Sequence, residues 1–264
     1  MKPRPLASAA ATAALVLGVP ALLPSPAAAA SGAYVALGDS YAAGVGAGDY
    51  DPASGDCRRS AVAHPALWAE AHDPASFEFT ACSGARTQDV LASQLGPLDR
   101  ETALVSVTAG GNDAGFADTI QTCVLRGTDA CLTALAAADE YIRAALPAAL
   151  DALYAEIVER APNAEVAVLG YPHLYELDGG CLLGISEESR AVINATADLL
   201  NETIAKRAAD HGFAFGDVRP AFDGHEICSS DEWLHSVTLP VGDSYHPTAE
   251  GQAEGYYPVL DAVA

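Results

Sequence analysis

The chain has 264 residues and is strongly acidic, with 13 lysines and arginines against 35 aspartates and glutamates and a net charge of −22. This charge disfavours nucleic acids and anionic membrane surfaces as partners, because both are negatively charged themselves. It favours solubility and places no restriction on a neutral substrate.

Residues 1–30 have the pattern of a secretory signal peptide. Lys2 and Arg4 form a short basic start, an apolar run covers residues 7–23, and four alanines end at Ala30. This order of basic, apolar and small residues is typical of an exported precursor. A membrane anchor is the alternative, but the apolar run is short for a span. We therefore expect a secreted, extracellular protein without a stable membrane anchor, whose residues 31–264 form one domain.

Short apolar runs predict the strands of a parallel sheet, because buried parallel strands are apolar on both faces. These runs cover residues 34–37, 77–80, 103–108, 166–169 and 213–215. Most of them stop at or close to a glycine.

Helical periodicity over residues 139–160 and 186–209 places helices between the strands. Pro147 lies inside the first pattern and should kink or break it, whereas Pro247 is suited to begin a last helix. Strands that alternate with helices favour a sheet covered on both faces.

Four short motifs contain residues with catalytic chemistry. Residues 38–40, 80–85 and 110–113 follow the first three predicted strands, and residues 243–247 lie near the C-terminus. Each motif alone has an ordinary structural explanation, such as a turn or a helix cap. Ligands of parallel sheets bind beyond the carboxyl ends of the strands, which is where the first three motifs lie.

Together the four motifs resemble the conserved blocks of the SGNH hydrolases, also called the GDSL esterase/lipase family. The likeness is greatest to secreted actinobacterial lipases and esterases, and it spans the whole mature chain. The four family residues would be Ser40, Gly84, Asn112 and His246. The resemblance implies a three-layer α/β/α sandwich with a five-stranded parallel sheet of flavodoxin-like type, so that residues 31–264 would be one catalytic domain.

The resemblance implies a carboxylic ester hydrolase, a lipase or carboxylesterase of lipid degradation. Ser40 would attack the ester and His246 would act as its general base. The backbone N–H groups of Ser40 and Gly84 and the side-chain amide of Asn112 would form the oxyanion hole. The group that orients the histidine stays open. Asp243 is the first candidate, through its carboxylate, and a main-chain carbonyl of Asp243 or Ser244 is the second.

Other function classes have sequence signals of their own. An α/β-hydrolase would carry Gly-x-Ser-x-Gly, which the sequence lacks. An esterase for acetylated sugars, a phospholipase, and a non-catalytic binding module on the same fold remain alternatives. The mechanism requires no cofactor or metal, and no His-Glu-x-x-His zinc motif occurs. We expect a monomer that takes a small-molecule or lipid ester.

Six cysteines in an exported chain predict disulfides. No two have the close spacing of a structural zinc site. Pairing in sequence order closes the shortest loops and is our prediction, which joins Cys57 to Cys82, Cys123 to Cys131, and Cys181 to Cys228.

Several further residues are expected to support the site. The loops over residues 113–138 and 179–236 should build the pocket walls, and two of the disulfides should hold them. Within the second segment, Leu182, Leu183 and Ile185 are candidates for lining an acyl site. Asp39 and Asp113 should fix loops by accepting backbone hydrogen bonds. Trp233 should pack in the core.

Overall fold

The computed structural model describes Met1, residues 32–181 and residues 184–264, so residues 2–30 of the predicted signal peptide lie outside the described residues. Five strands form one sheet in the order β2-β1-β3-β4-β5, and every neighbouring pair is parallel. The predicted five-stranded parallel sheet is therefore confirmed. The strands are β1 (Ala33–Gly38), β2 (Ser76–Phe79), β3 (Thr102–Thr108), β4 (Glu165–Leu169) and β5 (Ala214–Gly216).

The central strands are buried on both faces, which explains their continuous apolar sequence. In β1 only Ala33 is partly exposed, and the hydroxyl of the buried Tyr34 pairs with Ser106 of β3 at 2.7 Å. The edge strand β2 instead alternates, with Ser76 and Glu78 exposed. One-sided burial gives an edge strand a weaker apolar signal than a central one.

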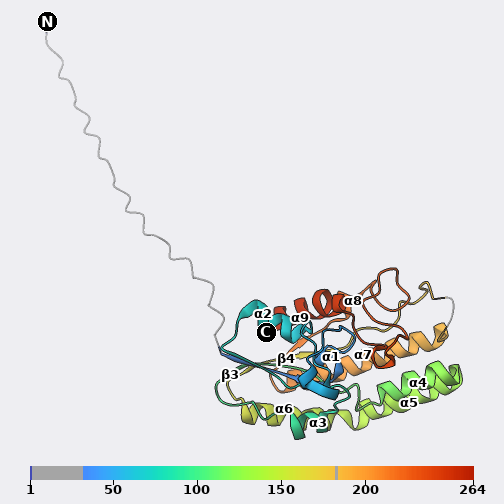
Figure 1. Cartoon of the computed structure of the whole chain (residues 1–264), viewed down its shortest axis with the longest axis horizontal. Coiled ribbons are helices and arrows are strands. Elements are labelled where there is room, and N and C mark those ends of the chain that lie inside the picture. Colours follow the sequence, from blue (N-terminus) through green and yellow to red (C-terminus); the bar gives the residue numbers. More distant parts are fainter. Residues whose placement is uncertain (2–31, 182–183) are drawn as a thin grey trace.

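Helices cover both faces of the sheet (Figure 1). Helices α2, α8 and α9 lie on one side of the sheet in that view, and α3, α5 and α6 lie on the other, where α7 packs against α6. The predicted α/β/α sandwich is confirmed. The α-helices are α1 (Ser40–Ala43), α2 (His64–His72), α3 (Thr87–Ser93), α4 (Phe116–Arg126), α5 (Thr128–Ala144), α6 (Leu146–Arg160), α7 (Glu187–Asp210), α8 (Arg219–Phe222) and α9 (Tyr257–Val263), with 3-10 turns at Pro52–Cys57 and Val241–Asp243 and a π-helical turn at Gly251–Tyr256.

Pro147 divides the helix predicted over residues 139–160 into two. Helix α5 ends at Ala144, Ala145 forms a turn with φ −114° and ψ −40°, and α6 begins at Leu146 with the proline in its first turn. A proline fits there because the first N–H groups of a helix have no partner within it. The helix predicted over residues 186–209 is confirmed as α7, and Ser186 caps it.

The prediction that Pro247 begins the last helix is wrong. Pro247 instead pairs with Leu234 in an isolated antiparallel bridge. Helical structure starts at Ala249, and the Thr248 hydroxyl caps it by accepting from the Gly251 N–H at 3.1 Å. The bridge keeps the proline in extended backbone, so the capping threonine marks the start of the helix.

The three disulfides pair in sequence order, as predicted. Cys57–Cys82 joins the segment after α1 to the β2–α3 loop, Cys123–Cys131 joins α4 to α5, and Cys181–Cys228 joins the segments on either side of α7. Among the described helices, none combines the length and apolar character needed to cross a bilayer.

Candidate active site

Ser40 lies at the carboxyl end of β1, where it is the first residue of α1. The turn into α1 is tight. Gly38 has φ +128°, and an added Cβ would come within 2.4 Å of the Thr108 carbonyl oxygen, so only glycine fits. Asp39 caps the helix by accepting from the Tyr41 N–H at 2.9 Å. The sequence therefore fixes the backbone on both sides of the serine.

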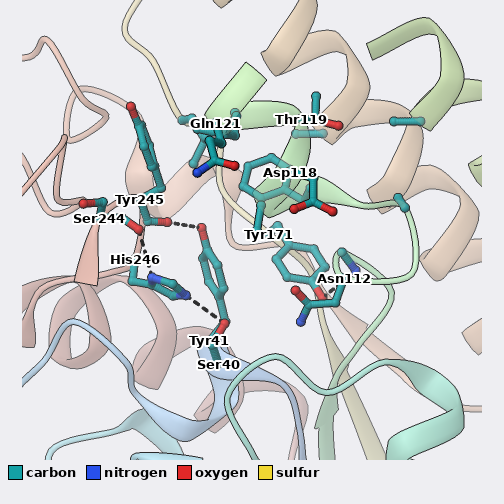
Figure 2. Close-up of a pocket in the computed structure, with 18 of the residues that line it drawn as sticks. Ser40, Tyr41, Asn112, Asp118, Thr119, Gln121, Tyr171, Ser244, Tyr245 and His246 are labelled. Carbon is teal, nitrogen blue, oxygen red and sulfur yellow. Dashed lines mark hydrogen bonds between the residues drawn. The ribbon is translucent and has the colours of Figure 1, made fainter. Parts of the chain in front are cut away.

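His246 contacts the serine directly (Figure 2). Its Nε2 lies 2.8 Å from Ser40 Oγ, and its Nδ1 lies 3.0 Å from the main-chain oxygen of Ser244. A carbonyl oxygen only accepts, so Nδ1 carries the ring proton and Nε2 accepts from the serine hydroxyl. This is the hydrogen-bond pattern of a nucleophile beside its general base.

The carboxylate of Asp243 is not placed on the histidine, in contrast to our first candidate for the orienting group. It pairs with the guanidinium of Arg58, and the Tyr50 hydroxyl donates to it at 3.4 Å. A full positive charge is a better partner for a carboxylate than a neutral imidazole N–H. The structure thus favours the alternative, in which the Ser244 carbonyl faces Nδ1.

The backbone conformation of Tyr245 aims the Ser244 carbonyl at the ring. Tyr245 has φ +64°, in the left-handed region, which costs a non-glycine residue roughly 1–2 kcal/mol. Two bonds hold it there. Its N–H donates to the His235 carbonyl at 2.8 Å, and its carbonyl accepts from the Tyr41 hydroxyl at 2.7 Å. Tyr41, the residue after Ser40, therefore helps to fix the loop that contains His246.

Gly84 and Asn112 line the same cavity as Ser40. Gly84 has φ +77°, with open space where a side chain would be, so its conformation rather than crowding requires glycine. The Asn112 amide donates one hydrogen to the Ala85 carbonyl at 3.1 Å, which leaves its second hydrogen available. In the view of Figure 2, Asn112 and His246 lie on either side of Ser40.

A buried tyrosine missed by the sequence analysis connects these loops. The Tyr171 hydroxyl donates to Asp39 Oδ2 at 2.6 Å and accepts from the Gly111 N–H at 3.1 Å. It therefore joins the loop of Ser40 to the loop of Asn112. The available signal was its position, two residues after the end of β4 and thus at the same sheet edge as the other motifs.

Both aspartates beside these motifs fix loops, as predicted. Asp113 accepts from the Thr87 backbone N–H at 3.0 Å and from its hydroxyl at 2.6 Å. Asp39 accepts from Tyr41 and Tyr171, and its complete burial raises the pKa of its carboxyl to about 7 despite those bonds. Burial disfavours the charged form of an acid, and the hydrogen bonds only partly offset it.

Burial also sets the charge of the histidine. It lowers the pKa of His246 to about 4, against the raising effect of the Ser244 carbonyl, and the nearby Arg58 lowers the pKa further. The imidazole is therefore neutral at neutral pH and able to accept a proton. A neutral ring is what a general base requires.

A cavity of about 530 Å³ opens beside Ser40, and much of its apolar lining comes from α4, α5 and α7. Segment 113–138 forms a wall as predicted, although as helices. Among the described residues of segment 179–236, only Thr196, Ala197 and Leu200 of α7 line the cavity. The apolar lining includes Ile120, Val124, Leu135, Ala138, Ile142, Leu174, Ala197 and Leu200.

Three other predicted lining residues have different outcomes. Ile185 is buried in the core and does not line the cavity. Leu182 and Leu183 lie outside the described residues.

Trp233 is partly buried and packs against the core, where its ring stacks on His225 and meets Phe222 edge-on.

Residues 36–254 match the model of the GDSL-like lipase/acylhydrolase family. The chain belongs to this family. A lipase from Streptomyces rimosus is 60% identical, with 97% of this chain and 98% of that protein covered. Lipase 1 from Streptomyces coelicolor (strain ATCC BAA-471 / A3(2) / M145) is 58% identical, with 89% and 88% covered.

Two solved structures of family relatives superpose closely. The extracellular lipase from Streptomyces rimosus is 62% identical with a TM-score of 0.87, over 88% of this chain and all (100%) of that one. A phospholipase A1 from Streptomyces albidoflavus NA297 is 58% identical with a TM-score of 0.87, over 89% and 100%. Because these close relatives are lipases, the chain is a carboxylic ester hydrolase. Its three disulfides and its similarity to an extracellular lipase show that it is secreted.

Proposed function

We propose that this hydrolase cleaves fatty-acyl esters through an acyl-enzyme on Ser40. The 2.8 Å contact between Ser40 Oγ and His246 Nε2 is the observation that carries the proposal. Oγ attacks the ester carbonyl carbon while Nε2 takes the hydroxyl proton. The proton then passes to the departing alcohol as the carbon–oxygen bond breaks. Water, activated by the same nitrogen, attacks the acyl-enzyme, releases the fatty acid and restores the serine.

Three donors stabilise the negative oxygen of the tetrahedral intermediate. They are the backbone N–H groups of Ser40 and Gly84 and the side-chain amide of Asn112. As the first residue of α1, Ser40 has an N–H without a partner inside the helix. The Ala85 carbonyl fixes the amide orientation of Asn112. Removal of one such donor typically costs about 3–4 kcal/mol of barrier.

The Ser244 carbonyl, rather than a side-chain acid, orients the base. It accepts from Nδ1–H at 3.0 Å, which selects the tautomer whose Nε2 is free to take a proton. It also stabilises the imidazolium that forms during the attack. No carboxylate is needed for either task, although a charged acceptor would stabilise the imidazolium more strongly.

The cavity favours long acyl chains as substrates. Its size of about 530 Å³ and its apolar residues fit a fatty-acyl chain, whereas an acetyl group would leave most of it unfilled. A phospholipid ester is a second candidate, because the structurally similar Streptomyces albidoflavus protein is a phospholipase A1. We further propose that residues 31–264 are one catalytic domain that acts as a monomer, after removal of a signal peptide at residues 1–30.

A chain-length assay tests this proposal. The purified protein is given p-nitrophenyl esters from acetyl to palmitoyl, a triglyceride and a phosphatidylcholine, with Ser40→Ala as the matched control. We expect hydrolysis of the long-chain esters and its loss in the variant. A maximum at acetyl without long-chain activity would refute the acyl specificity. Activity that survives Ser40→Ala would refute the nucleophile, and an inactive wild-type protein would favour the binding-module alternative.

A further inference from the structure

Exposed apolar side chains gather at the mouth of the cavity. Two of them, Val124 and Leu125, lie in the last turn of helix α4, and three more, Val237, Leu239 and Val241, lie on the loop that leads to His246. Their exposed fractions are 42, 71, 60, 89 and 71%, in that order. All except Leu239 line the cavity itself, and Leu239 stands two residues from both Val237 and Val241, which do. We refer to these five residues as the apolar rim.

This arrangement differs from the scattered apolar side chains of an ordinary surface. Single exposed aliphatic residues are common and need no explanation. The rim residues come from two segments more than a hundred positions apart in sequence, yet the two segments meet at one opening. Contiguous exposed apolar surface of this kind marks an interaction site.

The rim is continuous with the acyl cavity. From the exposed Leu125 and Val241 the lining passes inward to Ile120 and Leu200, and the same cavity contains Ser40. Long-chain esters in water are held in droplets or bilayers, because exposure of their chains to water is costly. A chain that moves from such a phase into the cavity avoids water only if the mouth contacts the lipid.

Charge restricts the kind of lipid surface that can be bound. The rim segments 124–125 and 237–241 contain no charged residue, and the chain as a whole has a net charge of −22. Asp118 adds a carboxylate to the cavity lining, the exposed Arg126 follows Leu125 at the end of α4, and the guanidinium of Arg58 is paired with Asp243. An anionic lipid surface would repel this protein, whereas a neutral one would not.

We propose that the apolar rim docks on the surface of electrically neutral lipid aggregates, so that an acyl chain enters the cavity directly from the lipid. The proposal rests on the hydrolysis of long-chain esters proposed above and adds the surface through which the enzyme reaches them. Leu239 is the side chain to test, because it is 89% exposed and does not line the cavity.

Binding is measured first, with protein that cannot consume the vesicles. Ser40→Ala protein is mixed with phosphatidylcholine vesicles and floated, with and without Leu239→Ser. The loss of one buried aliphatic side chain should weaken binding about tenfold. Val158→Ser is the matched control, since Val158 is an exposed aliphatic residue of α6 outside the rim and should have no effect. The proposal would be overturned if the Ser40→Ala protein with Leu239 intact showed no detectable binding. It would also be overturned if Leu239→Ser and Val158→Ser weakened binding equally.

Activity is measured next, with Ser40 intact. Leu239→Ser should leave kcat/KM for dissolved p-nitrophenyl butyrate unchanged and lower the rate on phosphatidylcholine vesicles about tenfold. Equal losses on both substrates would place Leu239 in the site rather than at the lipid surface. Tighter binding to phosphatidylglycerol than to phosphatidylcholine would overturn the charge argument, and a dimer that Leu239→Ser dissociates would assign the rim to a second copy. Absence of hydrolysis of every ester by the wild type would refute the proposed function alone, because the flotation result stands without it.

Discussion

At the scale of single residues, His246 is held by one side chain and one main-chain group. Ser40 donates to one ring nitrogen and the Ser244 carbonyl accepts from the other. Asp243, which has the position expected of a triad acid, binds Arg58. The two candidate acceptors therefore have separable roles that substitution can test.

Substitution of Asp243 by asparagine should have little effect on catalysis. The change removes the ion pair with Arg58 but leaves the Ser244 carbonyl on the imidazole. We expect kcat to fall by less than about threefold, whereas the same change in a Ser-His-Asp triad lowers kcat roughly 10⁴-fold. Steady-state kinetics on a long-chain p-nitrophenyl ester measures this. A fall of a thousandfold or more would restore the carboxylate to the mechanism.

The pH profile should show an unusually acidic limb. The pKa of His246 is lowered to about 4 by burial, so the ring stays neutral and basic well below the ordinary histidine value of 6.5. We expect kcat/KM, which reports the free enzyme, to fall to half its plateau near pH 4. An acid limb centred near pH 6.5 would contradict the lowered pKa.

Circular dichroism at each pH serves as the control for that profile. Between pH 4 and 6.5 the unfolded chain takes up a proton at His246 that the folded protein does not. This group therefore contributes stability that is complete above pH 6.5 and is lost as the pH falls towards 4. A loss of folded signal that coincides with the loss of activity would attribute the acid limb to unfolding.

The pairing of Ser40 with His246 could be predicted from sequence, but not the group that contacts the other ring nitrogen of His246. Ser40 and His246 stand in short motifs whose residue types have few other joint explanations. The choice between Asp243 and Ser244 depends on the left-handed backbone at Tyr245 and on the position of Arg58, which is distant in sequence. Tyr171 was missed because an isolated tyrosine after a strand resembles an ordinary core residue.

At the scale of elements, helices as well as loops build the wall of the cavity. Segment 113–138 was interpreted as loop, yet Phe116–Arg126 and Thr128–Ala144 are helices separated by Gly127. The sequence could locate strand ends and the break at Pro147, because proline and glycine act locally. Which face of α4, α5 or α7 lines a cavity depends on packing between elements distant in sequence, so local pattern could not show it.

Reduction of the space between α5 and α7 should shorten the preferred acyl chain. Ala197 lines the cavity from α7, and Ala197→Phe would fill part of it. Exclusion of two methylene groups from burial costs ~1.6 kcal/mol, about tenfold in rate. We expect the ratio of kcat/KM for palmitoyl over butyryl esters to fall by that factor, and by less in the smaller Ala197→Val. Unchanged selectivity with an unchanged melting temperature would show that acyl chains bind elsewhere.

At the scale of the whole molecule, three disulfides connect elements around the site. Cys57–Cys82 ties the chain after α1 to the loop of Gly84, and Ser83 N–H donates to the Cys57 carbonyl at 3.1 Å. Cys123–Cys131 ties two walls of the cavity. The order of the cysteines in the sequence sufficed to predict these pairs, because each bridge joins two cysteines that are consecutive along the chain.

The bridges should differ in their contribution to stability. Cys181–Cys228 spans 47 residues of sequence and Cys123–Cys131 spans 8. A longer closed loop restricts the unfolded chain more. We therefore expect the free energy of unfolding to fall by about 4 kcal/mol when Cys181–Cys228 is removed and by ~2.5 kcal/mol when Cys123–Cys131 is removed. Urea unfolding of the two double Cys→Ala variants measures this. A larger loss for the short loop would show that strain or local packing dominates over loop entropy.

The use of a main-chain acceptor on His246 has a genetic consequence. Every amino acid carries a backbone carbonyl, so no codon change at position 244 deletes the acceptor itself. The Ser244 side chain has a separate task, because its hydroxyl accepts from the Thr238 N–H at 3.0 Å. Inherited loss of the orienting group must therefore arise indirectly, at positions such as Tyr245 and Tyr41 that hold the backbone in place. We expect selection on this function to act on those conformational supports rather than on the residue that supplies the oxygen.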